Sequence, residues 1–204
     1  MLNEVKSAFV ENKRAILAAA AIFLVSMILG YVLEPYTHSF FNPIVDELTQ
    51  KVKTGVIKIT FWSIFSNNIR IVFSMFIYGM AFCFSAVILA FNAFFAAYYV
   101  ATKSDLTYTL LLIVPHGIFE FSSCIIACAS GFVLFNFVMN FLKGIYRQEN
   151  GPVKSILHTS YSQNHVKLKQ AIILLIVASI LMAIAGFVET YLTIPIADFI
   201  LNFK

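Results

Sequence analysis

The stretch AILAAAAIFLVSMILGYVL, residues 15–33, decides the fold class because it runs for 19 residues without a charged side chain. As a helix it extends about 28 Å at 1.5 Å per residue, close to the hydrocarbon thickness of a bilayer. The preceding segment is polar and mixed in sign, which differs from a secretory signal. We therefore expect a first transmembrane helix over 15–33 that remains as an anchor.

The composition of the whole chain supports a cell-membrane protein. Hydrophobic residues make up 60% of the 204 residues and charged residues only 12%, which leaves too little polar surface to cover a water-soluble domain. Lys and Arg exceed Asp and Glu by 14 to 10 without forming a basic stripe, which fits lipid headgroups and excludes nucleic acid as a partner. Cys83, Cys124 and Cys128 lie in apolar runs, where we expect small hydrophobic thiols and no cofactor.

Later apolar runs predict the other membrane segments. Residues 71–102 carry no charge over 32 positions, too many for one untilted span, so we expect a helix over 70–90 and a break near Asn92. Helices are also predicted over 116–142 and 171–188. The expected fold class is all-α: a polytopic membrane helix bundle with about five transmembrane segments, one of them broken or re-entrant near residues 92–114.

Charge and turn residues predict the topology. Basic residues before the first span place the N-terminus in the cytoplasm, and a basic excess over 143–170 makes that segment a cytoplasmic loop. Between the first two spans, Asn42-Pro43 and Gly55 bound an external amphipathic helix over 43–54, which we expect to cap its own bundle. Its predicted apolar stripe consists of Ile44, Leu48, Val52 and Val56. The C-terminal end, residues 191–203, reads as an amphipathic tail broken at Pro195.

The most unusual local feature is Pro115-His116-Gly117-Ile118-Phe119-Glu120, which lies between apolar runs. Pro115 stands where a helix could begin, and His116 and Glu120, four residues apart, share one helix face. Ionisable groups at membrane depth usually face a protein interior or a wet cavity and are functional. These four residues, Pro115, His116, Gly117 and Glu120, are therefore the predicted polar intramembrane motif.

Polar residues elsewhere could support this motif. Asn67 and Asn68 precede an apolar run, where either could cap a helix. Arg70 near a helix N-terminus opposes the helix dipole, which calls for an anionic partner or for a side chain that reaches the headgroups. Asn92 interrupts the long uncharged run and marks the expected break.

Several kinds of chemistry remain open for the motif. His116 and Glu120 are half of a metal site, and further ligands could come from Asn92, Asn136 or Glu189. No HExxH or GxSxG motif is present, so we expect no catalytic residues and no enzyme. A proton or ion relay is a second option, and buried polar bonds that fix the bundle are a third.

The sequence resembles the stage II sporulation protein M family of integral membrane proteins. The resemblance covers most of the chain and rests on these residues in order: Asn67-Asn68-x-Arg70, Gly79, Asn92, Pro115-His116-Gly117-x-x-Glu120, Ala127, Ala129, Ser130 and Gly131. The Asn-Gly pair usual in the family is Asn92-Ala93 here. The resemblance implies a multi-helix membrane protein. Its sporulation members look like scaffolds that assemble cell-wall-degrading enzymes during engulfment, and many relatives occur in organisms that never sporulate.

From these observations we expect a non-enzymatic integral membrane scaffold or interaction subunit for cell-envelope remodelling. Its partners would be the lipid bilayer and other membrane or envelope proteins, with a homodimer as one option. The alternative is a small ion- or proton-coupled channel or transporter that uses His116 and Glu120.

Overall fold

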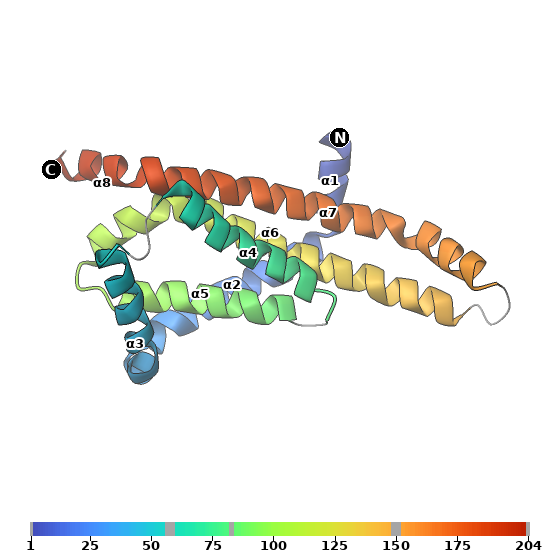
Figure 1. The fold of residues 1–204 in the computed structure, drawn as a ribbon, viewed down its shortest axis with the longest axis horizontal. Helices are drawn as coiled ribbons and strands as arrows, with labels where there is room; N and C mark the ends of the chain where they lie inside the picture. The colour runs from blue at the N-terminus through green and yellow to red at the C-terminus, as the bar shows by residue number, and fades with distance from the viewer. Residues whose placement is uncertain (1, 56–59, 82–83, 148–151, 203–204) are drawn as a thin grey trace.

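The computed structural model describes residues 2–55, 60–81, 84–147 and 152–202, and all regular structure in these ranges is α-helical. Figure 1 shows the helices as a long bundle with α3 across one end. The helices are α1 Leu2–Glu11, α2 Lys13–Val32, α3 Glu34–Lys53, α4 Phe61–Tyr78, α5 Phe84–Ala101, α6 Leu106–Tyr146, α7 Val153–Tyr191 and α8 Thr193–Asn202.

Helix α6 lies at the centre of the bundle. It packs along α7 over much of its length and also contacts α2, α4, α5 and α8, while α2 packs mainly on α5. Successive long helices run in alternating directions, so the starts of α2 and α7 lie on the side of the bundle away from α3 (Figure 1). The buried core consists of apolar residues from these long helices, with Ala8 of α1 added to it.

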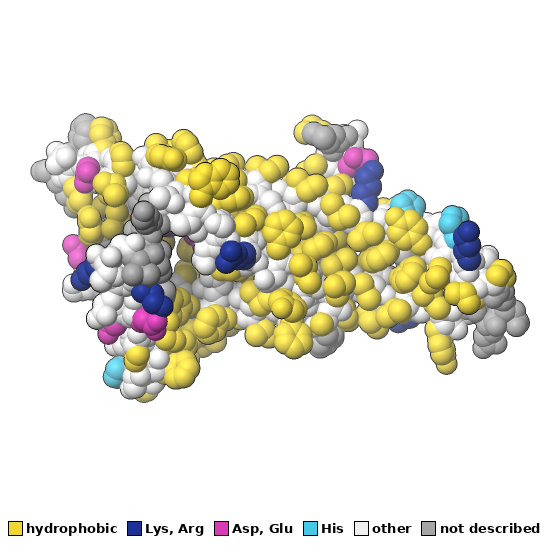
Figure 2. Space-filling model, in the orientation of Figure 1, with side chains coloured by type: hydrophobic (Ala, Val, Ile, Leu, Met, Phe, Trp, Pro, Cys, Tyr) yellow, Lys and Arg dark blue, Asp and Glu magenta, His cyan; other side chains and the backbone are white. Residues whose placement is uncertain are grey.

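The bundle has the surface of a membrane protein. Four of the helices in the described ranges, α2, α5, α6 and α7, are long and apolar enough to cross a bilayer. In Figure 2 hydrophobic side chains cover most of the visible face, and charged side chains gather mainly toward the two ends. The protein is thus an all-α membrane bundle. The 18-residue α4 runs beside these helices and contacts α5, α6 and α7.

The last two long helices are much longer than a bilayer is thick. Helices α6 and α7 have 41 and 39 residues. At 1.5 Å per residue each extends about 60 Å, twice the ~30 Å of a hydrocarbon core. They project as a pair beyond the connection between α4 and α5 (Figure 1). We call this projecting part, residues 135–147 of α6 and 153–166 of α7, the arm.

The arm corrects the prediction of a cytoplasmic loop over 143–170. Residues 143–146 continue α6, and 153–170 form the first half of α7. The polar residues there are compatible with helix, and close packing holds the two helices together. Ser160 donates a hydrogen bond of 2.7 Å to the carbonyl of Phe141, and the Ser160 side chain fills the space where a Cβ at Gly144 would lie.

The expected helix over 70–90 is also wrong, because the chain reverses within it. Helix α4 ends at Tyr78 and α5 begins at Phe84, so the uncharged run 71–102 forms parts of two antiparallel helices. Ser85 in the first turn of α5 donates to the carbonyl of Met75 on α4 and so links the two helices across this reversal. Gly79 at the end of α4 lacks a side chain, which lets α4 meet the backbone of Gly131 on α6.

The region 92–114 is interrupted, but at a different place and in a different way from the prediction. Asn92 lies inside α5, where its amide donates to the thiol of Cys124 at 3.7 Å, so no backbone break is required. The interruption is the connection between α5 and α6, residues 102–105, and the two helices are antiparallel (Figure 1). Asp105 caps α6 by accepting from the amide of Tyr108 at 2.9 Å. Residues 102–105 therefore form a turn between two antiparallel helices, and the segment is not re-entrant.

Proline residues lie within helices more often than the sequence suggested. Pro115 does not begin a helix: α6 starts nine residues earlier and continues through it, which membrane helices tolerate when neighbouring groups satisfy the freed carbonyl. Pro43 likewise lies inside α3, which already starts at Glu34. The C-terminal tail bends at Leu192, between α7 and α8, and Pro195 falls in the first turn of α8.

The buried face of α3 differs from the predicted stripe. Phe41 packs against Phe94 and Tyr98 of α5, with ring centroids 5.6 and 5.2 Å apart, and Val45 is buried. Ile44 is 39% exposed. The side chains of Leu48 and Val52, and the whole of Val56 and Cys83, lie outside the described residues. The helix nevertheless packs on its own bundle as expected, and Gly55 ends it with φ 73°.

Helix α1 is fastened to α7 by a polar network. Gln170 of α7 is 4% exposed and accepts from the buried amide of Asn12 at 2.9 Å, while its own amide donates to Glu11 at 2.8 Å. Lys167 also donates to Gln170, at 2.9 Å, and Lys169 pairs with Glu4 at 2.5 Å. The hydrogen bond and positive charge of Lys169 lower the pKa of Glu4, so this contact stabilises docking at neutral pH and is lost as pH falls through the lowered value.

Replacing Gln170 should release α1. In Gln170→Leu the buried amide of Asn12 keeps only the carbonyl of Ala8, and Glu11 loses one of its partners, so we expect the lost hydrogen bonds to cost about 1–3 kcal/mol. We expect hydrogen exchange of residues 2–11 to rise at least tenfold, with exchange in α5 unchanged. Gln163→Leu, on the exposed side of the same helix, is the control. Unchanged protection of α1 in Gln170→Leu would show that apolar packing alone holds this helix.

Candidate functional site

Three ionisable side chains meet near the end of the bundle that carries α3 and α8. His116 and Glu120 lie one turn apart on α6, and Glu189 comes from the last turns of the antiparallel α7. One ligand atom from each side chain lies within 4.8 Å of the other two, and all three residues are half-buried. We call His116, Glu120 and Glu189 the His-Glu-Glu cluster. The sequence motif supplies two of its members, and the pairing of α6 with α7 supplies the third.

His116 is oriented by the start of α8. Its Nδ1 lies 3.4 Å from the hydroxyl of Thr193, a buried residue. That hydroxyl donates its only hydrogen to the carbonyl of Val188 at 3.1 Å, so it can only accept from the imidazole. Nδ1 therefore carries the hydrogen, and the lone pair of the neutral ring is on Nε2.

Glu120 is oriented by α4. Asn68 donates to its Oε1 in a long hydrogen bond of 3.4 Å, and Asn67 in turn donates to the side-chain Oδ1 of Asn68 at 3.2 Å. Both asparagines lie inside α4, which begins at Phe61, so neither caps a helix as predicted. Thr60 caps it instead, in a reciprocal pair with Ser63. The asparagine pair therefore contacts the cluster from α4 instead of capping that helix.

The cluster has no basic partner in the part of the chain that the structure describes. Neither Glu120 nor Glu189 forms an ion pair with a described Lys or Arg. Arg70, which the sequence offered as a partner of Glu120, is exposed on α4 and likewise makes no ion pair there. Two carboxylates close together in a partly buried place repel each other unless a proton or a cation lies between them.

The structure separates the predicted polar residues into two groups. Asn68 contacts Glu120 directly, and Asn67 contacts Asn68. Asn92 on α5 contacts Cys124, which lies one turn along α6 from Glu120, and Asn136 is exposed on the arm, so neither belongs to the cluster. Thr193 is the residue that sequence reasoning missed. Its position four residues after Glu189 keeps it close to that carboxylate in the chain, although the two residues lie on different helices, α7 and α8.

Nucleophilic side chains near the motif are used in packing. Ser123 donates to the carbonyl of Ala178 at 2.7 Å, and Ser122 and Ser130 donate to carbonyls of their own helix. Cys124 and Cys128 are buried and free, as expected of small hydrophobic thiols. The cluster itself can bind a proton or a cation.

The motif and the helices around it match one family model. The model described as stage II sporulation protein M matches residues 19–194, from α2 into α8. The chain belongs to this family. The match includes the His-Glu-Glu cluster and its partners on α4 and α8, so the cluster lies within the family's shared region.

Two curated relatives come from the archaeon Methanocaldococcus jannaschii. The uncharacterised protein MJ0706 is 30% identical over 207 aligned residues, which cover 96% of this stage II sporulation protein M family chain and 89% of the relative. The uncharacterised protein MJ0793 is 30% identical over 155 residues, covering 72% of this chain and 78% of the relative. No solved structure matches the chain significantly.

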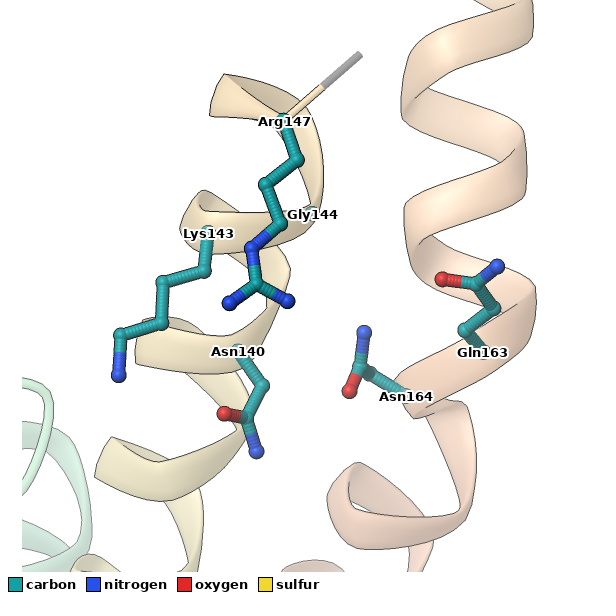
Figure 3. A pocket seen from close by; sticks show the side chains of 6 residues that line it. All are labelled: Asn140, Lys143, Gly144, Arg147, Gln163 and Asn164. Carbon is teal, nitrogen blue, oxygen red and sulfur yellow. The ribbon is translucent and has the colours of Figure 1, made fainter.

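A second polar feature lies in the arm of this family member. A groove of about 390 Å³ between α6 and α7 is lined by Asn140, Lys143, Gly144, Arg147, Gln163 and Asn164. Figure 3 shows the Arg147 guanidinium turned into the space between the two helices, above Asn140, with Asn164 across from it. The groove lies far along α6 from Glu120, so it is separate from the His-Glu-Glu cluster.

Proposed function

We propose that the protein is a non-enzymatic integral membrane scaffold whose arm binds a partner protein of the cell envelope. The observation that carries this proposal is the projection of α6 and α7 past the rest of the bundle. A helix pair that only had to cross the bilayer would need half of this length. The additional length supports a role outside the membrane core.

The side chains of the arm support protein binding. Tyr146 is 89% exposed and Val153 is 72% exposed, and Leu157 and Tyr161 add further apolar surface along α7. Exposed apolar groups of this kind, rimmed by polar residues, are typical of interaction surfaces. Basic residues accompany them in the arm, Lys143, Arg147 and Lys154, and Lys167 and Lys169 follow on α7, where they contact the α1 network.

The same basic residues support a proposed orientation of the protein in the membrane. By the positive-inside rule the arm and α1 lie in the cytoplasm, and α3 and the His-Glu-Glu cluster lie toward the outer face. The partner would therefore be a cytoplasmic protein or the cytoplasmic segment of another membrane protein. A second copy of the chain remains an option for this surface.

The arm should determine which proteins accompany the chain. We expect the protein, purified from its native membranes after mild cross-linking, to retain envelope proteins, and Tyr146→Ser with Leu157→Ser to reduce that recovery at least tenfold. Both side chains are exposed, so the bundle should stay folded. Tyr36→Ser on α3, 83% exposed at the opposite end, is the matched control. A chain that is always recovered alone, or equal recovery with all variants, would contradict the scaffold proposal.

One observation favours a second candidate function, a small proton- or ion-coupled transporter. Two glutamates and a histidine in one place are the usual carriers along such a path. Reconstitution in liposomes separates the two functions. Flux that wild type supports and Glu120→Gln abolishes would favour transport, and absence of flux from folded wild-type protein would exclude it.

A further inference from the structure

We infer that the His-Glu-Glu cluster binds one divalent transition-metal ion, with zinc preferred over manganese. The ligands are Nε2 of His116 and one carboxylate oxygen each from Glu120 and Glu189. This inference does not depend on the scaffold proposal, because it concerns the purified chain alone.

The distances fit a metal after small side-chain movements. Zinc binds nitrogen and carboxylate oxygen at about 2.0–2.2 Å, so two ligand atoms of one ion are up to about 4 Å apart. The three ligand atoms here are already within 4.8 Å of one another. Side-chain rotations of His116, Glu120 and Glu189 can close the remaining difference without moving α6 or α7.

The groups behind the ligands are arranged as in metal sites. A ligating histidine usually donates its other ring N–H to an oxygen, which fixes the tautomer and directs the free lone pair at the metal. Thr193 supplies that oxygen for His116, because its own hydrogen is given to Val188. Among the described residues no group hydrogen-bonds to Nε2. Asn68 performs the corresponding task for the Glu120 carboxylate.

The negative charge of the cluster favours binding of a cation. Two carboxylates in a half-buried setting carry negative charge that no described Lys or Arg balances. A divalent ion would neutralise both at once. The mixed donor set selects the kind of ion, because imidazole suits zinc and its neighbours, whereas calcium and magnesium prefer oxygen ligands alone. Three protein ligands also leave a coordination position for water.

Metal binding by the purified protein tests the inference. The chain should carry a tag without histidine, be stripped with a chelator in detergent, and then be dialysed against Zn²⁺ or Mn²⁺ before elemental analysis. We expect about one zinc per chain and weaker binding of manganese. Glu189→Gln and His116→Gln should lower the zinc affinity at least 100-fold, and zinc should raise the unfolding temperature of wild type but not of these variants.

Two further variants separate a metal site from a merely polar cluster. Thr193→Val keeps the size of the side chain but removes the oxygen that accepts from His116, and we expect a 10- to 100-fold loss of zinc affinity. His158→Gln and Glu47→Gln, exposed residues on α7 and α3, should bind zinc as wild type does. Folded wild-type protein that binds no zinc, or unchanged affinity in Glu189→Gln, would overturn the inference and leave a proton-sharing pair.

Discussion

Gly131→Leu should prevent the bundle from assembling. Gly131 lies where α4, α5 and α6 cross, and a Cβ there would lie 2.6 Å from the carbonyl oxygen of Met75 and would overlap the hydroxyl of Ser85. The opposing group is backbone on α4, which cannot rotate away. Overpacking of a well-filled core costs about 1–3 kcal/mol for one added group, and a leucine side chain adds several carbons. We therefore expect loss of the monodisperse detergent-solubilised species.

Alanine variants at two glycines provide the control for this stability measurement. Gly131→Ala should lower the free energy of unfolding in detergent by about 1–3 kcal/mol. Gly186→Ala, at another buried glycine, should change it little, because the nearest atom to a Cβ there is 3.6 Å away on the ring of Phe61. Equal stability of the two alanine variants would show that the helices separate easily at the crossing, contrary to the close packing described.

Shortening the arm should abolish partner retention while leaving the bundle stable. The fully buried residues of the core end at Leu134 on α6 and resume at Ala171 on α7, and Phe137, which packs against them from the arm, lies outside the replaced segment. Replacing residues 145–159 with a short glycine-serine linker joins Gly144 to Ser160, which already touch. We expect an unfolding temperature within a few degrees of wild type and at least a tenfold loss of co-purified envelope proteins.

The shortened chain also separates two explanations of a lost partner. If the unfolding temperature falls by ten degrees or more, the arm stabilises the bundle, and the inference from the positions of the core residues is wrong. If the temperature holds and the partners remain, the binding surface lies elsewhere, and exposed α3 is the next candidate. Zinc binding should be unaffected in either case, because the His-Glu-Glu cluster is at the far end of α6.

Much of the fold could be predicted because apolar runs of bilayer length allow few alternatives. The helix over 15–33 corresponds closely to α2, and the membrane-bundle class is confirmed. The reversal near Gly79 was missed because no charged residue marks the helix ends, and Ser85, which links them, is a single small polar residue in an apolar run. The loop over 143–170 was wrong for the opposite reason. The segment was expected to connect two spans as a loop, although polar residues form long helices when a partner helix supports them.

The candidate site was predicted only in part, because its members lie on different helices. His116 and Glu120 are one turn apart, so local spacing is sufficient to pair them. Glu189 lies 69 residues after Glu120, and its approach depends on the register between α6 and α7, which packing such as that of Ser160 on Phe141 determines. From the sequence, Glu189 was one of three candidate further ligands, together with Asn92 and Asn136. Only the antiparallel pairing of the two helices distinguishes it.

The network between α1 and α7 has a consequence for biosynthesis. Asn12 and Gln170 are separated by 158 positions, so α1 cannot dock on α7 until most of the chain has been synthesised. At 5–20 residues per second, translation of that interval takes about 8–30 s. During this time the buried amide of Asn12 has only the local carbonyl of Ala8. Docking of α1 onto α7 is therefore a late step in folding, because it requires that α7 has already been synthesised.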